Sequence, residues 1–173
     1  MQYMHYLQPY LHIKGFIPSL ALTFTWCAFL FRFRSSMWSL AFLTFPGTAA
    51  HETAHYLVGV LLFAKPQTFT LLPKKVGNTW VLGSVSFSGI CLLNAAFVAM
   101  APFLLMPIAW LALTHIVSPL WIKEQWVLWF FANYLTATFL FAGIPSSQDF
   151  KVGGTSLCVY LTLAAFWCLG RIL

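Results

Sequence analysis

Long apolar stretches, separated by short clusters of polar and charged residues, make up almost the whole chain. A helix needs about 20 apolar residues to cross a bilayer core of about 30 Å. The apolar stretches predict about five such helices, over residues 16–31, 37–64, 89–113, 125–144 and 155–169. The pattern therefore predicts an all-α polytopic membrane protein whose residues 1–173 form one integral membrane domain.

One stretch, residues 67–88, departs from this helical pattern. Lys65-Pro66 closes the second predicted span, and polar and apolar residues then alternate weakly. A turn-forming cluster at residues 73–78 separates this part from a second extended run at residues 79–87. Alternation on both sides of a turn is typical of a hairpin. We therefore expect a membrane-associated β-hairpin between the second and third spans, with an edge strand that can pair with an extended peptide. A hairpin that only connects two helices is the alternative.

Composition supports the membrane class. Hydrophobic residues make up 61% of the chain and charged residues only 7%, whereas about a quarter of the residues of a soluble domain are charged. The net charge of +6 comes from nine basic residues against three acidic ones. The basic residues are scattered between apolar segments rather than clustered, so they indicate membrane topology and not a nucleic-acid partner.

The strongest chemical signal is His51-Glu52-Thr53-Ala54-His55, inside the second predicted span. Residues four apart lie on the same face of a helix, so His51 and His55 can bind one metal ion. Glu52 borders that face, where its carboxylate can act as a general base in zinc-assisted hydrolysis. The alternative is a helix whose histidines only hydrogen-bond neighbouring helices. Ionisable groups are costly to bury in a membrane, which favours the metal site.

A catalytic zinc takes three protein ligands. Apart from Glu52, the chain has only two acidic residues, Glu124 and Asp149. Asp149 follows a proline-containing break at the end of the fourth predicted span, whereas Glu124 lies beside Lys123 in a tryptophan-rich, interfacial segment. Asp149 is therefore the predicted third ligand, with Glu124 and His115 as alternatives; His115 is expected in the loop after the third span.

Three polar features within or between the predicted spans suggest how a substrate could be held. Asn94 and Asn133 lie in apolar surroundings, so each needs a hydrogen-bond partner, which can be another helix or a substrate backbone. Residues 143–150 are irregular by composition, and irregular backbone within a membrane is tolerated where it lines a cavity. Asn94 and Asn133 are weak candidates for substrate binding.

Over residues 37–150 the chain resembles the site-2 protease family of intramembrane zinc metalloproteases. The resemblance comprises the His51-Glu52-x-x-His55 motif, a β-rich segment, a span with an asparagine, and a later span that ends in Asp149. It implies Zn²⁺ held by His51, His55 and Asp149, with Glu52 as the catalytic base. It also implies a multi-pass protein of a prokaryotic cytoplasmic membrane, whose substrates are transmembrane or membrane-proximal protein segments.

The chain departs from the family pattern at two places. The family often has Gly-Pro-x-x-Asn after the β segment, where this chain has Gly89-Ile90-Cys91-Leu92-Leu93-Asn94. It typically has Asn-x-x-Pro before Leu-Asp-Gly, where this chain keeps Pro145 and Asp149 without the leucine and glycine. The membrane zinc proteases that process prenylated proteins are a second comparison. They use a glutamate as third ligand, and in this chain only Glu124 could serve.

The predicted function is hydrolysis of peptide bonds by an intramembrane zinc metalloprotease, with the lipid bilayer and a membrane protein substrate as its partners. One alternative is a non-proteolytic metal-binding membrane protein, such as a transporter or an assembly partner. A transporter usually carries metal-binding groups along a path, whereas this chain concentrates them in one place. The other alternative is a membrane zinc hydrolase of a non-peptide substrate.

Overall fold

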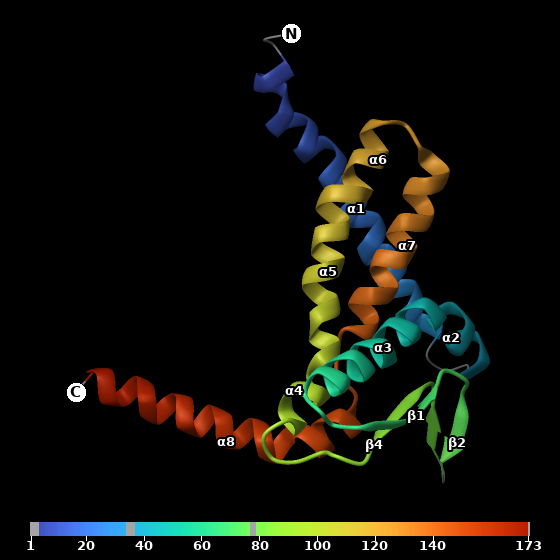
Figure 1. The fold of residues 1–173 in the computed structure, drawn as a ribbon. Coiled ribbons are helices and arrows are strands. Elements are labelled where there is room, and N and C mark those ends of the chain that lie inside the picture. Colours follow the sequence, from blue (N-terminus) through green and yellow to red (C-terminus); the bar gives the residue numbers. More distant parts are fainter. Residues whose placement is uncertain (1–3, 34–36, 77–78, 173) are drawn as a thin grey trace. The chain divides into compact units, whose positions relative to one another are not determined.

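A computed structural model describes residues 4–33, 37–76 and 79–172 of the 173-residue chain. The described residues are mostly helical, with two small antiparallel sheets (Figure 1). They group into two compact units. One comprises residues 1–50 and 104–143, and the other comprises residues 51–103 and 144–173. Each unit is described by itself.

The first unit is a set of apolar helices tied together by polar pairs. It contains α1 (Met4–Arg32), α2 (Met37–Leu43), the start of α3 (Phe45–Leu61), α5 (Leu105–Ala112), a π-helical turn (Leu113–Val117), α6 (Ser118–Ile122) and α7 (Trp126–Ala142). The Thr23 hydroxyl of α1 donates to Asn133 of α7 over 2.9 Å, and the Trp129 indole donates to the Ser19 hydroxyl over 2.8 Å. Such pairs fix the register of α1 against α7, because a polar group left unpaired between apolar helices is costly.

The second unit carries the strands. The first strand, β1 (Pro66–Thr70), pairs with β4 (Ser84–Phe87), and β2 (Lys74–Val76) pairs with β3 (Thr79–Val81), in both cases antiparallel. These are the strands of the predicted β-hairpin, although its turn at residues 77–78 lies outside the described residues. Thr68 and Thr70 face Ser86 and Ser84, with hydroxyl–hydroxyl distances of 2.6 and 2.9 Å. These cross-strand pairs match the threonines to serines on one face of the ladder.

Two helices complete the second unit, the short α4 (Ala95–Ala99) and the long C-terminal α8 (Ser147–Ile172). The Ser156 hydroxyl of α8 donates to the Leu92 carbonyl over 2.6 Å and accepts the Ala96 N–H over 3.1 Å. The Tyr160 hydroxyl donates to the Leu93 carbonyl over 2.8 Å. The first half of α8 is therefore fastened to the N-terminal turn of α4.

Three helical stretches of the described chain are long and apolar enough to cross a membrane, namely Lys14–Arg32, Ala101–Ile122 and Ser147–Arg171. The apolar helix Trp126–Ala142 is shorter. Apolar helices of this kind are compatible with the predicted membrane protein. The number of helices that meet the criterion is smaller than the five predicted spans.

The predicted span over residues 37–64 is two helices, α2 and α3, separated at Thr44. Pro46 explains the break, because it has no N–H to donate to the carbonyl four residues earlier. It stands in the first turn of α3, where a proline is tolerated. The His51-Glu52-x-x-His55 motif therefore lies on a separate 17-residue helix rather than on one long span.

The predicted span over residues 89–113 has the wrong boundaries. Residues 89–94 are not helical, and a continuous helical stretch instead runs from Ala101 to Ile122. His115 therefore lies in the π-helical turn and not in a loop. Pro119 cannot donate to the His115 carbonyl, and the Ser118 hydroxyl donates to the Leu113 carbonyl over 2.7 Å, so the helix widens at this point instead of ending.

Candidate metal centre

The buried face of α3 carries Glu52, His55 and Gly59, which are spaced by three and four residues. This spacing places them along one side of the helix. His51 lies one turn before His55, at the border of the same face. The motif thus presents two imidazoles and one carboxylate from a single helix, as the sequence predicts.

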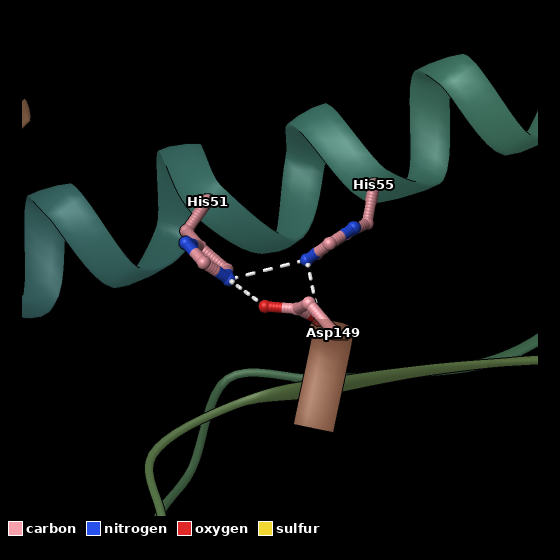
Figure 2. Close-up of side chains that lie close together, drawn as sticks. All are labelled: His51, His55 and Asp149. Atoms are coloured by element: carbon pink, nitrogen blue, oxygen red, sulfur yellow. Dashed lines mark hydrogen bonds and ion pairs between the residues drawn. The ribbon is translucent and has the colours of Figure 1, made fainter. Parts of the chain in front are cut away.

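Asp149 meets the two imidazoles from the start of α8 (Figure 2). The Nε2 atoms of His51 and His55 are 3.1 Å apart. Oδ1 of Asp149 is 3.2 Å from Nε2 of His55, and Oδ2 is 3.5 Å from Nε2 of His51. All three residues belong to the second unit. Two segments almost a hundred residues apart in the sequence therefore bring three metal-ligating side chains together.

The three side chains fit a metal ion. Ligands about 2.0–2.1 Å from a tetrahedral zinc ion lie roughly 3.3–3.4 Å from one another. The distance between the two imidazole nitrogens and the approach of one Asp149 oxygen to each imidazole are near this value, and with one ligand atom taken from each residue the three atoms lie within 4.8 Å of one another. The side chains of His51 and Asp149 are 13% and 15% exposed, so the group is largely shielded from water. Among the residues that the structure describes, no other three His, Cys, Asp or Glu side chains come together in this way. The donor set suits a divalent transition metal, without specifying zinc.

The tautomer of His55 follows from its partner on the other side of the ring. Nδ1 of His55 lies 2.7 Å from the carbonyl oxygen of Val98 in α4. A carbonyl can only accept, so Nδ1 carries the proton and the Nε2 atom of the neutral ring is a bare acceptor. That acceptor points at the carboxylate of Asp149, which also only accepts. A cation between them would satisfy both groups.

Asp149 has a second role as part of a helix cap. Its Oδ2 atom accepts the backbone N–H of Ser146 over 2.6 Å, and its own N–H lies 3.2 Å from the Ser146 hydroxyl, which accepts it. This reciprocal pair is a capping box, in which the cap and the residue three positions later each satisfy the other's backbone N–H. The box starts α8 at Ser147, eight residues earlier than predicted, and fixes the orientation of the carboxylate.

We predict that Ser146→Ala weakens zinc binding by about three- to tenfold while the protein remains folded. The substitution removes the hydroxyl that accepts the Asp149 N–H, a loss of ~1 kcal/mol for a typical cap, and leaves the carboxylate less firmly oriented. The dissociation constant for Zn²⁺, measured by competition with a chromophoric chelator, checks this.

Ser147→Ala is the matched control for that measurement. Ser147 is the next residue, is exposed, and has no side-chain hydrogen bond in the described structure. It should bind zinc as the wild type does. Equal affinities of the two alanine variants would contradict a role for the capping box in orienting Asp149.

Glu52 faces the hairpin, where it has no hydrogen-bond partner among the described residues. It is 7% exposed and close enough to His51, His55 and Asp149 for electrostatic interaction. A Cβ atom at Gly83, between β3 and β4, would lie 2.7 Å from Cγ of Glu52 and 3.0 Å from its Oε1. The absence of a side chain at Gly83 thus leaves the space that the Glu52 carboxylate occupies.

The strand β4 lies along α3 beside this carboxylate. A Cβ atom at Gly59 would collide with the ring of Phe87 at the end of β4, and Gly83, the residue before β4, approaches Glu52, so the chain from Gly83 to Phe87 meets α3 at two places. Four strand residues span about 13 Å and seven helical residues about 10 Å, so the two contacts match in length. The hairpin is therefore held directly against the helix face that carries the motif.

The group of metal-ligating side chains in the second unit consists of His51, His55 and Asp149, and the other two candidates for the third ligand belong to the first unit. Glu124 and His115 are exposed residues of the first unit, and Glu124 occupies a left-handed backbone conformation (φ 56°) in the turn between α6 and α7. The predicted preference for Asp149 therefore agrees with the geometry. The predicted irregular segment at 143–150 is wrong in its second half, because residues 147–150 already belong to α8.

The two asparagines have partners inside the protein. Asn94 is 7% exposed; its carbonyl oxygen accepts the Cys91 N–H over 2.8 Å, and its amide nitrogen donates to the carbonyls of Gly89, over 2.9 Å, and Leu62, over 3.4 Å. Asn133, fully buried in the first unit, accepts from Thr23 and donates to the Trp129 carbonyl. These bonds give both residues structural roles, and substrate binding by them stays a prediction.

Comparison of the chain with protein-family models, with curated proteins and with solved structures gives no significant match. The resemblance to site-2 proteases therefore stays a prediction that rests on the residues and their geometry.

Sequence reasoning does not identify three contributors to this site. Ser146 carries a readable signal, because Ser-x-x-Asp after a proline is a capping-box pattern. Gly83 and the Val98 carbonyl carry none, since a glycine beside a hairpin has many roles and a backbone carbonyl has no sequence signature.

Proposed function

We propose that this protein is a metal-dependent hydrolase, with zinc as its metal, that cleaves peptide bonds in membrane-embedded or membrane-proximal protein segments. The observation that carries the proposal is the pairing of two features at one place. Three side chains that can bind a metal bring one ligand atom each to within 4.8 Å of one another, and Glu52, a buried residue whose carboxylate has no hydrogen-bond partner in the described structure, lies beside them. A site that only stores a cation has no use for the second feature.

His51, His55 and Asp149 would hold the metal. Their set of two imidazoles and one carboxylate leaves the fourth position of a tetrahedral ion open, as catalytic zinc sites do. A zinc ion bound there would supply Lewis acidity, which polarises a peptide carbonyl and makes a water molecule more acidic. The Val98 carbonyl and the capping box orient two of the three ligands before any ion arrives.

Glu52 would move the proton. Its carboxylate has no hydrogen bond to the described residues that a reaction would first have to break, and it is held between α3 and Gly83. In this role it takes a proton from the attacking water and gives it to the leaving amine, as a general base and then a general acid.

The strands suggest how a peptide is presented. Each described sheet has only two strands, so β1 and β4 each have an edge with which no other described strand pairs. An extended segment can add to such an edge through main-chain hydrogen bonds. Because β4 lies against the face of α3 that carries Glu52, a segment paired to this sheet would run near the site.

The apolar helices favour membrane proteins as the substrates. One of the described helices that could cross a membrane is α8, and its first turn carries Asp149. A site next to such a helix is reached most readily by a segment that is itself in, or beside, the bilayer. A zinc hydrolase of a non-peptide substrate would share the same centre but would not need the strand edge.

We predict that the purified protein binds close to one zinc ion per chain and loses its hydrolytic activity when a chelator removes the ion. Cleavage of a panel of detergent-solubilised transmembrane peptides should fall to background, because without the ion the candidate site has no Lewis acid to polarise the peptide carbonyl. Stoichiometric Zn²⁺ should restore the activity. Metal content by mass spectrometry and cleavage by gel and mass analysis check the two parts.

Magnesium serves as the matched control, because a hard cation with a preference for six oxygen ligands suits this donor set poorly. Addition of Mg²⁺ to the chelated protein should leave it inactive. Cleavage that persists after complete metal removal would contradict the proposal. Zinc binding accompanied by hydrolysis of lipid esters alone would replace the peptide substrate by a lipid one.

A further inference from the structure

We propose that the metal centre lies at the surface of the bilayer, level with the lipid headgroups, and that its substrates are the segments of membrane proteins just outside the hydrocarbon core. The placement follows from α8 and the strands of the second unit. The substrate class rests in addition on the proposed function. Of the two kinds of substrate in that proposal, membrane-embedded and membrane-proximal, it selects the second.

The second half of α8 is exposed around its whole circumference. Every residue from 161 to 170 is exposed, and almost all of them are apolar. Among them, Leu161, Phe166 and Trp167 have 61%, 70% and 62% of their surface exposed. A helix that is apolar all round is either buried in protein or crosses a membrane. The described part of the chain leaves this half of α8 uncovered, so lipid is the surrounding that suits it.

The charged residues of α8 mark where such a span begins and ends. Asp149 and Lys151 stand at its start and Arg171 at its end, and no residue between Lys151 and Arg171 is charged. Twenty helical steps separate these two basic residues, a length of about 30 Å, and the hydrocarbon core is about as thick. The Arg171 guanidinium lies 4.2 Å from the ring centre of Trp167, and both residue types favour the membrane–water interface. The helix therefore fits the bilayer with Lys151 at one surface and Arg171 at the other.

The metal centre is at the Lys151 end of this helix. Asp149 precedes Lys151 by two residues, about 3 Å along the helix axis, and its carboxylate meets His51 and His55. With the centre in the middle of the bilayer, Lys151 would lie deep in hydrocarbon, and apolar residues such as Phe166 would extend into water on the far side. Both are unfavourable, so the centre lies close to the surface.

The charges of the second unit favour the same depth. Its acidic residues, Glu52 and Asp149, are both shielded, whereas four of its lysines are exposed, namely Lys65, Lys74, Lys75 and Lys151. Exposed lysines beside a span are attracted to the phosphate groups of anionic lipids. In the hydrocarbon core the same ammonium groups would be without water or a counter-charge.

The strands next to the site also suit the headgroup region. The exposed hydroxyls of Thr68 and Thr70 face those of Ser86 and Ser84, whereas Phe69 alternates to the other face of the ladder. An open sheet edge in contact with lipid does not occur within the hydrocarbon core, because its backbone groups would be unpaired there. The approach of Gly83 to Glu52 ties these strands to the depth of the metal centre.

A centre at this depth reaches a particular part of its substrate. The backbone groups of a transmembrane helix are paired within the helix, so the helix must unwind before it can add to a strand edge. The stretch just outside the core is hydrated and can become extended at lower cost. We therefore expect the scissile bond in the stretch that adjoins a transmembrane helix.

The placement is tested with the full-length protein in vesicles of phosphatidylcholine and phosphatidylglycerol. A nitroxide is attached to Val152→Cys, Leu161→Cys or Leu169→Cys, three exposed positions of α8, after the four native cysteines are replaced by alanine. Collisions with oxygen, which concentrates in hydrocarbon, and with a neutral nickel chelate, which stays in water, report the depth of each label. The label at position 161 should be the deepest, about 13 Å below the label at position 152, which is nine helical residues away.

Two results would overturn the placement: the greatest depth at position 152, or free access of the nickel chelate to position 161. The wild-type protein provides a second measurement if the cysteine-free variant fails to fold. A phospholipid that carries a photoreactive diazirine in the middle of its acyl chain should label α8 around residue 161. Labelling centred on residues 147–153 would contradict the placement.

The substrate class is tested with two membrane peptides of one sequence. In each, a pair of lysines marks the end of the transmembrane segment, and the pair is moved by about four residues, roughly 6 Å of helix, between the two peptides. We expect cleavage beside the lysine pair, displaced with it, and none by Glu52→Gln. Cleavage of the same central bonds in both peptides would overturn the substrate class. No cleavage of either peptide, together with the expected label depths, would refute the proposed function and support the placement.

Discussion

Asp149→Ala should lower zinc affinity by at least a hundredfold. The substitution removes one of three ligands and leaves two histidines on one helix, which hold a transition metal only weakly. It also removes the carboxylate that now faces the bare Nε2 of His55 at 3.2 Å. Chelator competition at fixed pH and ionic strength measures the dissociation constant, and the metal content after gel filtration shows whether ions survive purification.

Asp149 also caps α8, so part of the effect could come from a frayed helix. Ser146→Ala separates the two roles, because it breaks the capping box and leaves the carboxylate in place. The zinc affinity that Asp149→Ala loses beyond the loss in Ser146→Ala measures the contribution of the carboxylate as a ligand. Gln148→Ala, at the exposed neighbouring position of α8, controls for substitution in this turn. Wild-type affinity in Asp149→Ala would rule out its role as third ligand.

The sequence predicts the part of the site that consists of histidine and acidic side chains, because these residue types are rare in this chain. The motif at residues 51–55 stands out because the chain has five histidines and three acidic residues in all. The same scarcity points to Asp149, since only two acids remain once Glu52 is assigned. The geometry agrees with that choice, as Asp149 lies within 3.5 Å of both imidazoles.

Element boundaries are predicted less well, and prolines account for the differences. Hydropathy alone merges α2 with α3 across Pro46, whose missing N–H separates them. It also ends the third span near residue 113, although the helical stretch passes through His115 and Pro119 as a π-helical turn. An apolar run shows that a segment is buried in protein or lipid, but not where its ladder of hydrogen bonds is interrupted.

The supporting contacts could not be predicted because they are made by the backbone. The short helix α4 links both halves of the centre: its Val98 carbonyl holds His55, and its first turn holds α8 through Ser156. The two acceptors are a backbone carbonyl and a serine hydroxyl, and neither stands out in the sequence. A pattern search therefore finds the ligands and misses the element that sets the distance between them.

Glu52→Gln should abolish hydrolysis and leave metal binding intact. Glutamine has nearly the same volume, so it fits the space beside Gly83, but its amide cannot take a proton from water. General base catalysis by a positioned carboxylate contributes about 10²–10⁴-fold, and the rate should fall by about a thousandfold or more. The zinc content should stay near one ion per chain, because Glu52 is not among the three ligands.

The matched control is Glu124→Gln, which makes the same chemical change at the only other glutamate, an exposed residue of the first unit. Its cleavage rate should equal that of the wild type. A single-turnover assay with excess enzyme compares the variants at the chemical step and removes differences in product release. Undiminished cleavage by Glu52→Gln would leave the metal centre without its base and would require another proton acceptor. Loss of zinc together with activity would instead assign Glu52 to the ligand set, because the same carboxylate cannot both bind the ion and take the proton.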